Sequence, residues 1–463
     1  MGDCLTRKNK KHTKKQPFKP NAKEASENFI KSSVGVAITN SMGDSYLSAY
    51  ALALGATDSF IGQLSAIPSL ISSTLQLLLA KRFKSRKNVI FIGILLTFLI
   101  WIGILSLSLY PVESALQLLL VYVIVYSSIN AILAPIWASW VGDYLRKSSM
   151  GSFFGKRDAI VSTLSAVGSL LAGYLLSISK SSGNQWIGFL LIFSLAALGR
   201  LISLYFLNKI PDVKPSYEKQ RKIRKRSILW DREHQKVRTF LLYSSVLFIA
   251  VTIASPFFVV YKLRILELTY LQYGILILIG AISRYFSSRY WGYMIDRYSS
   301  KDVTLAGGII IALHLFIYVY FPEFKYLILA EMLSGFGWSA HDVGGFTYIM
   351  THSNRETRAS YVSYYNFLFG ITRFIGTNIG LILIDRFNVY PFLGISGIPG
   401  VILFSGVLRL IVAVMFIPLL KDHGMRQEGK LIVAMLTEYP VRTVSHLIFH
   451  HHHYSHHTIK HIG

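Results

Sequence analysis

The stretch WGYMIDRYSSK, residues 291–301, joins two apolar segments of the chain, at 270–291 and 303–321. A second junction, AKRFKSR at residues 80–86, joins the apolar segments 58–80 and 88–109 in the same way. Both junctions are short and basic, and both follow the second apolar segment of their half of the chain. Two such junctions in corresponding places predict an internally repeated chain of long apolar segments.

Composition gives the number of these segments. Apolar residues make up 52% of the 463 residues and charged residues only 15%, with a mean hydropathy of +0.45. Because a membrane-spanning helix needs roughly 20 residues, this content is enough for about twelve spans. Twelve apolar stretches are found, at 30–54, 58–80, 88–109, 116–143, 158–179, 185–207, 238–262, 270–291, 303–321, 326–350, 360–384 and 401–420. We predict an all-α, polytopic membrane protein with twelve transmembrane helices in two six-helix bundles.

The connections between the stretches predict the topology. Every second connection is rich in Lys and Arg, as in RKIRKR at 221–226, whereas GATD at 55–58 and YPVE at 110–113 carry no basic residue. By the positive-inside rule, both termini are expected in the cytoplasm. The membrane is expected to be the plasma membrane. The predicted parts are a basic tail at 1–29, a six-helix half at 30–207, a basic linker at 208–237, a second half at 238–420 and a His-rich tail at 421–463.

Several classes of protein are excluded. The excess of 48 Lys and Arg over 23 Asp and Glu lies between apolar stretches, so it indicates topology rather than a nucleic-acid partner. Cys4 is the single cysteine, which excludes an intramolecular disulfide and a Cys-based zinc site. No phosphate-binding loop, zinc-protease motif or nucleophile elbow is found, so we expect neither an ATP-driven pump nor an enzyme, and no cofactor or resident metal. The His-rich end, 450–457, is read as a flexible tail, with metal binding as the alternative.

The 291–301 stretch resembles the G-x-(apolar)-x-D-R-(aromatic)-G-x-[RK] signature of the major facilitator superfamily, where that family carries its second copy. The resemblance extends over about 30–420 through the span number, the central basic loop and the repeat. Within the superfamily the chain is similar to a prokaryotic group without an assigned substrate. The segments behind this narrower likeness are APIW at 134–137, GKRDA at 155–159, GW at 337–338 and YYN at 364–366.

The resemblance implies a cytoplasmic gate. A carboxylate at a tight cytoplasmic turn can accept hydrogen bonds from the exposed amides at the N-terminus of a neighbouring helix, where the positive end of the helix dipole lies. Asp296 is therefore expected in such a turn, bound to the start of the fifth span near Arg157. The first-half copy has Lys81 in place of the acid, which puts the latch of that half in doubt. The candidate gating residues are Gly292, Asp296, Arg297, Lys301, Asp143, Arg157 and Arg358.

Polar side chains inside spans give the candidate binding site, because each costs roughly 2.5–3.5 kcal/mol to insert. Asp44, Asn130 and Arg373 are expected near the middle of the bilayer, and Arg284 with the neighbours His341 and Asp342 nearer the cytoplasm. The resemblance places their spans around one cavity. Asp44 is expected to take up a proton, to pair with Arg373 or to form a hydrogen bond between helices, while Arg373 or Arg284 would meet an anionic group of a solute. His341 and Asp342 are expected to form a proton relay or a second gate.

For the remaining polar and aromatic residues, structural roles are the main expectation. Tyr261 and Trp338 could stack on a solute, although packing and interface roles are common for such residues. Glu331 is expected to be solvated near the outer end of its span. Arg200 and Arg409 are expected to snorkel from peripheral helices to the membrane surface.

These features predict a secondary active transporter that moves a small solute by alternating access, with a proton as the coupling ion, as a monomer in the lipid bilayer. The alternative is a transporter-like membrane receptor or scaffold that does not transport. Its support is the altered first-half motif, the basic tail and the His-rich end.

Overall fold

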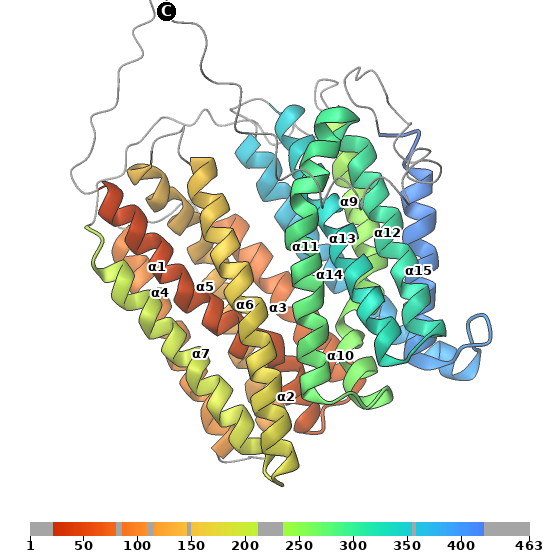
Figure 1. The fold of residues 1–463 in the computed structure, drawn as a ribbon, viewed down its shortest axis with the longest axis horizontal. Helices are drawn as coiled ribbons and strands as arrows, with labels where there is room; N and C mark the ends of the chain where they lie inside the picture. Colours follow the sequence, from red (N-terminus) through yellow and green to blue (C-terminus); the bar gives the residue numbers. More distant parts are fainter. Residues whose placement is uncertain are drawn as a thin grey trace, which may run out of the picture.

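The computed structural model describes residues 22–79, 86–109, 114–145, 150–211, 235–353 and 358–420. This part of the chain is helical, apart from one isolated bridge between Phe392 and Ile395. Figure 1 shows long helices that run side by side along one direction. The helical segments are α1 (Ala22–Met42) with η1 (Asp44–Tyr46) and α2 (Leu47–Ala53), α3 (Asp58–Leu79), α4 (Arg86–Leu109), α5 (Ala115–Tyr144), α6 (Met150–Ser181), α7 (Gln185–Asn208), α9 (Gln235–Ala254) with η4 (Ser255–Phe257), α10 (Phe258–Val260) and η5 (Tyr261–Ile265), α11 (Tyr270–Arg297), α12 (Ser300–Tyr320), α13 (Phe324–Thr351), α14 (Arg358–Val389) and α15 (Gly397–Met415).

Each apolar stretch of the sequence coincides with one of these segments, so the all-α prediction is confirmed. Among the described residues, eight helices are long and apolar enough to cross a membrane. The other segments are α1 to α2, α3, α11 and α13, which carry more polar side chains. Three of them hold predicted site residues, namely Asp44 on the first, Arg284 on α11 and His341 on α13. These side chains lie on helices that are poorly suited to face lipid, whereas Asn130 on α5 and Arg373 on α14 lie on two of the eight apolar helices.

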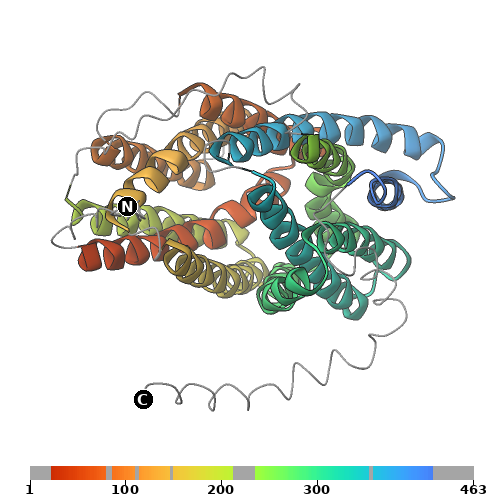
Figure 2. The same ribbon diagram turned by 90° about the horizontal axis from the view of Figure 1, so that it is seen from above.

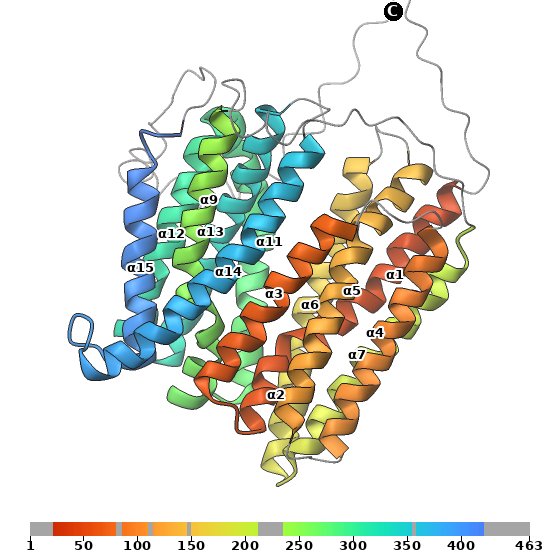
Figure 3. The ribbon, with the colours of Figure 1, turned by 180° about the vertical axis from the view of Figure 1, so that it is seen from behind.

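The two halves of the chain repeat each other in their packing. Figure 2 shows α1–α7 on one side of the molecule and α9–α15 on the other. Within the halves, α1 packs on α6 and α7 as α9 packs on α14 and α15, and α3 packs on α5 as α11 packs on α13. Between the halves, α3 packs on α14, as Figure 3 shows from behind, and α6 packs on α11. Because the same neighbours recur in both halves, the internal repeat seen in the sequence is structural.

Small residues allow the closest helix contact inside the first half. A Cβ atom built on Gly35 of α1 would lie 2.1 Å from the carbonyl oxygen of Gly199 on α7. A Cβ atom on Gly199 would lie 2.6 Å from the oxygen of Gly35. Two backbones approach this closely in membrane proteins only where both helices present small residues. This contact fixes the rotation of α7 and turns the next residue, Arg200, into the bundle.

The outer faces of the helices suit a lipid environment. Large apolar side chains are exposed at helical spacing along single helices, for example Leu95, Leu99 and Ile102 on α4 and Val167, Leu171 and Tyr174 on α6. In water such stripes would be an aggregation hazard. In a bilayer they are the surface that contacts the acyl chains.

The structure corrects one detail of the 291–301 stretch. The sequence suggested a turn that contains the Asp-Arg pair, whereas α11 continues to Arg297 and the turn is formed by Tyr298 and Ser299. Asp296 and Gly292 are therefore part of the last turns of α11. Ser299 caps α12 by accepting a hydrogen bond from the amide of Asp302 at 3.0 Å.

Candidate functional site

The first helix of each half is interrupted at the same place. The first segment breaks at Gly43, where a Cβ atom would lie 2.2 Å from the ring of Trp101, so glycine is required there. The corresponding segment of the second half breaks at Pro256, at the start of η4. Paired breaks in corresponding helices are the places where transporters leave backbone groups free to bind a solute or an ion. The candidate residue Asp44 follows the first of these breaks directly.

Asp44 lies directly after the first break, at the start of η1. Its side chain accepts a hydrogen bond of 3.1 Å from the hydroxyl of Tyr126 on α5. The Tyr126 hydroxyl in turn accepts a hydrogen bond from Arg200, whose guanidinium lies 5.2 Å from the Tyr126 ring centre. Asp44 is exposed, whereas Arg200 is only 6% exposed. A solvent-accessible carboxylate is thus backed by a buried cation.

This chain of contacts corrects two expectations. Arg200 does not snorkel to the surface, because the Gly35–Gly199 contact turns it inward. Arg409, its counterpart on α15, is also buried and donates to the carbonyl oxygen of Ile311 at 2.9 Å. Asp44 does not pair with Arg373 in this structure. The Nε of Arg373 donates to the Ser65 hydroxyl across the two halves at 2.9 Å.

The neighbouring candidates Asn130 and Tyr261 use their polar groups locally. Asn130 donates to the carbonyl oxygen of Tyr126, one turn earlier on α5, at 3.0 Å. Tyr261 is buried and donates to the carbonyl oxygen of Tyr318 at 2.8 Å. Tyr261 is therefore a packing residue in this conformation, whereas Asn130 lies one turn from the Asp44 contact.

The structure brings three predicted residues of the second half together. Arg284 of α11 forms an ion pair with Asp342 of α13, and the Nδ1 of His341 lies 3.7 Å from the other carboxylate oxygen of Asp342. His341 is fully buried, and its ring centre lies 5.8 Å from that of Trp338. The side chains of Arg284 and Asp342 remain partly exposed, at 54% and 37%.

The candidate gate is not assembled in this conformation. Asp296 is exposed, and within the described residues it makes no hydrogen bond or ion pair. A Cβ atom built on Gly292 would meet nothing within 4 Å. Arg157 instead bonds the adjacent Asp158 at 2.9 Å and lies over the Trp137 ring. The expected contact between Asp296 and α6 is not made in this conformation.

Asp143 and Arg297, two other gating candidates, contact residues of their own half. Asp143 of α5 forms an ion pair with Arg86, which the sequence reasoning did not single out. The guanidinium of Arg297 lies 5.7 Å from the Tyr298 ring centre, and Lys301 is in the first turn of α12. The side chain of Arg358 and all of Lys81 lie outside the described residues.

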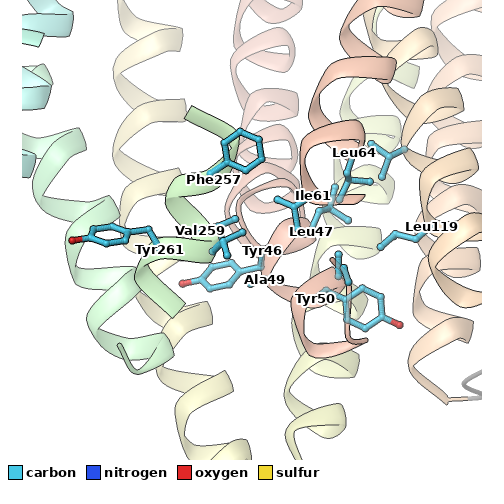
Figure 4. Packing of buried hydrophobic residues seen from close by; sticks show 14 of the residues in the cluster. Tyr46, Leu47, Ala49, Tyr50, Ile61, Leu64, Leu119, Phe257, Val259 and Tyr261 are labelled. Atoms are coloured by element: carbon cyan, nitrogen blue, oxygen red, sulfur yellow. The ribbon is translucent and has the colours of Figure 1, made fainter. Parts of the chain in front are cut away.

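At one end of the molecule the halves are in contact, and we call it the closed end. Arg264 of η5 bonds Asp58 at the start of α3 at 2.7 Å, and it also bonds the carbonyl oxygen of Ala56. Deeper in, the rings of Tyr46 and Tyr273 meet at 5.7 Å. Figure 4 shows Phe257, Val259 and Ile61 in the apolar cluster beside these contacts. Figure 1 shows the halves converging there, at α2 and α10.

The sequence reasoning missed a buried ion pair of the second half. Glu331 was expected to be solvated, but it accepts a hydrogen bond from Lys262 at 2.6 Å and another from the hydroxyl of Tyr318. The signal was available, since a Lys late in the seventh span and a Glu early in the tenth lie at similar depth. Their opposite charges in neighbouring spans predict a pair.

The fold defines a membrane protein of two repeated helical halves. The sequence model of the Major Facilitator Superfamily matches residues 32–377 and 285–431. The chain belongs to the major facilitator superfamily. No curated protein matches it in sequence.

Solved structures agree with this family. The chain is similar to the nucleoside transporter NupG, with 15% identity and a TM-score of 0.63 over 86% of this chain and 99% of that one. It is similar to a bacterial homolog of the human lysosomal transporter Spinster, with 14% identity and a TM-score of 0.65 over 86% and 96%. It is also similar to a POT family transporter in complex with a thioalcohol-conjugated peptide, with 13% identity and a TM-score of 0.62 over 87% of this chain and 96% of that one. At these identities the likeness is one of fold.

Proposed function

We propose that this protein is a secondary active transporter that moves a small solute across the plasma membrane by alternating access, with a proton as the coupling ion. The observation that carries the proposal is the placement of Asp44 at the break of the first helix, exposed to solvent yet backed by the buried Arg200. A carboxylate in this position can bind and release a proton or a cationic group. The two halves that meet at α3–α14 and α6–α11 provide the surfaces for a rocking motion.

The site supports a solute that carries charge. Asp44 would meet a cationic group or the coupling proton, and Arg284 or Arg373 would meet an anionic group. The similar structures come from transporters of nucleosides and from one that holds a conjugated peptide, so the fold accepts chemically different solutes. The particular solute is therefore sought by experiment rather than taken from a neighbour.

The proposed topology gives the orientation of the two ends of the molecule. With both termini in the cytoplasm, the closed end at Asp58 and Arg264 faces outward, and the candidate gate around Asp296 faces the cytoplasm. The six-helix halves at 30–207 and 238–420 would move as units, joined by the basic linker 208–237. The protein would act as a monomer in the bilayer.

Two experiments test the function. A thermal-shift screen of the purified protein against small metabolites identifies a ligand, because a ligand that binds the native state raises its apparent stability. Flux of that ligand into proteoliposomes under an imposed pH gradient then tests transport. We expect accumulation in the wild type, loss of accumulation with retained downhill exchange in Asp44→Asn, and wild-type behaviour in Asp385→Asn, an exposed carboxylate of α14. A ligand that binds but never crosses the membrane would favour the receptor alternative.

A further inference from the structure

A second buried charged cluster lies in the closed end of the second half. Lys262 of η5 and Glu331 of α13 form an ion pair of 2.6 Å, with side chains that are 9% and 16% exposed. The hydroxyl of Tyr318 on α12 donates a further hydrogen bond to Glu331. Gly280 of α11 leaves room for the carboxylate, since a Cβ atom there would lie 3.1 Å from its oxygen. Four segments of one half thus enclose this pair.

The surroundings of the pair are aromatic. The ammonium group of Lys262 lies 5.3–5.8 Å from the ring centres of Phe258, Tyr273 and Tyr318. The faces of aromatic rings stabilise a cation less than its hydration in water does. Within the described residues, Glu331 is the only carboxylate paired with Lys262. A change in the charge of Glu331 therefore leaves the ammonium group without its counter-charge, and truncating or neutralising one partner of a buried pair is strongly unfavourable.

The turn that carries Lys262 also closes the molecule. Residues Tyr261–Ile265 form a π-helical turn, a local form that is frequent at functional sites. Lys262 points from this turn into its own half, whereas Arg264, two residues later, bonds Asp58 and the carbonyl oxygen of Ala56 in the other half. One short turn therefore joins the buried pair to the contact that holds the closed end together.

A second contact links the cluster to the other half. Tyr273, whose ring faces Lys262, also packs edge-on against Tyr46 of η1 at 5.7 Å. The hydroxyl of Tyr46 donates to the carbonyl oxygen of Ser169 on α6 at 2.6 Å. Separation of the halves at the closed end would remove Tyr46 from this ring. The environment of Glu331 thus differs between the closed and the open state of this end.

We propose that Glu331 is a proton-binding site that controls opening of the closed end. Proton uptake from water converts the carboxylate to a neutral carboxylic acid, and Lys262 then loses its counter-charge. The π-helical turn is released, Arg264 separates from Asp58, and the end opens. Loss of the proton restores the pair and recloses the end. The inference rests on the proposed function and adds to Asp44 a second protonation site.

The groups that face Glu331 come from each packed element. Lys262 from η5 and Tyr318 from α12 bond Glu331, and Tyr273 from α11 lies beside Lys262. Tyr261 and the buried His314 contact Tyr318 in turn. Among these groups of the described residues, His314 is the one histidine, so the test includes it.

Distance measurement by electron paramagnetic resonance tests the proposal without a known solute. Spin labels are placed at Ser182→Cys and Glu323→Cys, two exposed positions at the closed end in opposite halves, in a Cys4→Ser background. We expect the long-distance population of the full-length protein in nanodiscs to rise severalfold from about pH 8 to about pH 5. Glu331→Gln should give a high long-distance population with no pH dependence.

Further variants separate the alternatives. Lys262→Gln leaves the carboxylate but removes its partner, and it should also abolish the pH dependence. Asp58→Asn should raise the long-distance population at every pH and keep the dependence, and His314→Gln should keep it unchanged. A pH response that persists in Glu331→Gln and Lys262→Gln, or that disappears in His314→Gln, would overturn the proposal. Accumulation in proteoliposomes is scored separately, so an intact transporter without this response refutes only the role of Glu331.

Discussion

Replacing Tyr126 by Phe removes the hydroxyl that joins Asp44 to Arg200. Two hydrogen bonds to charged groups are lost, and each contributes about 1.5–3 kcal/mol. Water can replace the bond to the exposed Asp44, whereas the donor of the buried Arg200 is left without its acceptor. The expected loss is therefore about 2 kcal/mol in the free energy of unfolding.

The assay is reversible unfolding in mixed micelles, followed by tryptophan fluorescence. Tyr122→Phe is the matched control, because Tyr122 lies one turn earlier on α5 and packs on Gly103, and within the described residues its hydroxyl makes no hydrogen bond. The control should change stability by less than about 0.5 kcal/mol. Combined with Arg200→Met, Tyr126→Phe should show a coupling energy of about 1–3 kcal/mol. Equal effects of the two phenylalanine variants, or strict additivity with Arg200→Met, would refute the role of this hydroxyl.

Three further predictions concern packing, topology and the gate. Gly35→Ala should destabilise the protein by about 1–3 kcal/mol through overpacking, whereas Gly155→Ala, which would meet nothing within 4 Å, should be neutral in the same unfolding assay. In intact cells and a Cys4→Ser background, an impermeant thiol reagent should label Ser182→Cys but not Asn208→Cys; reversed labelling would contradict the topology. Asp296→Asn should reduce transport at an unchanged protein level, and an unaffected rate would show that Asp296 has no gating role.

Hydropathy predicts this fold well because the bilayer leaves few alternatives for the backbone. The predicted stretch 185–207 and the observed α7, Gln185–Asn208, differ by one residue. Hydropathy does not predict how each helix is rotated about its axis. Arg200 was assigned to the surface because a span number says nothing about which side of the helix a residue occupies. The close contact between Gly35 and Gly199 decides that side, and it depends on two helices far apart in the sequence.

The same difficulty explains the other misplaced residues. Glu331 was judged by its distance from the end of the span, but its surroundings depend on Lys262, and the π-helical turn shifts the register of that residue. His341, Asp342 and Arg284 were predicted as candidates from their polar side chains inside apolar spans, and the structure brings them together. Charge inside a span is thus visible in the sequence, whereas the identity of its partner depends on helix rotation.

The central claim is that the two halves must separate at the closed end for a solute to cross. Asp58→Cys and Arg264→Cys, in a Cys4→Ser background, place one thiol on each half where the native side chains meet. A reducible bifunctional thiol reagent then links the halves, and accumulation of the identified solute is measured in proteoliposomes before linking, after linking and after reduction. We expect transport by the unlinked variant, loss of transport on linking and recovery on reduction. Undiminished accumulation while the link is intact would contradict alternating access through this end.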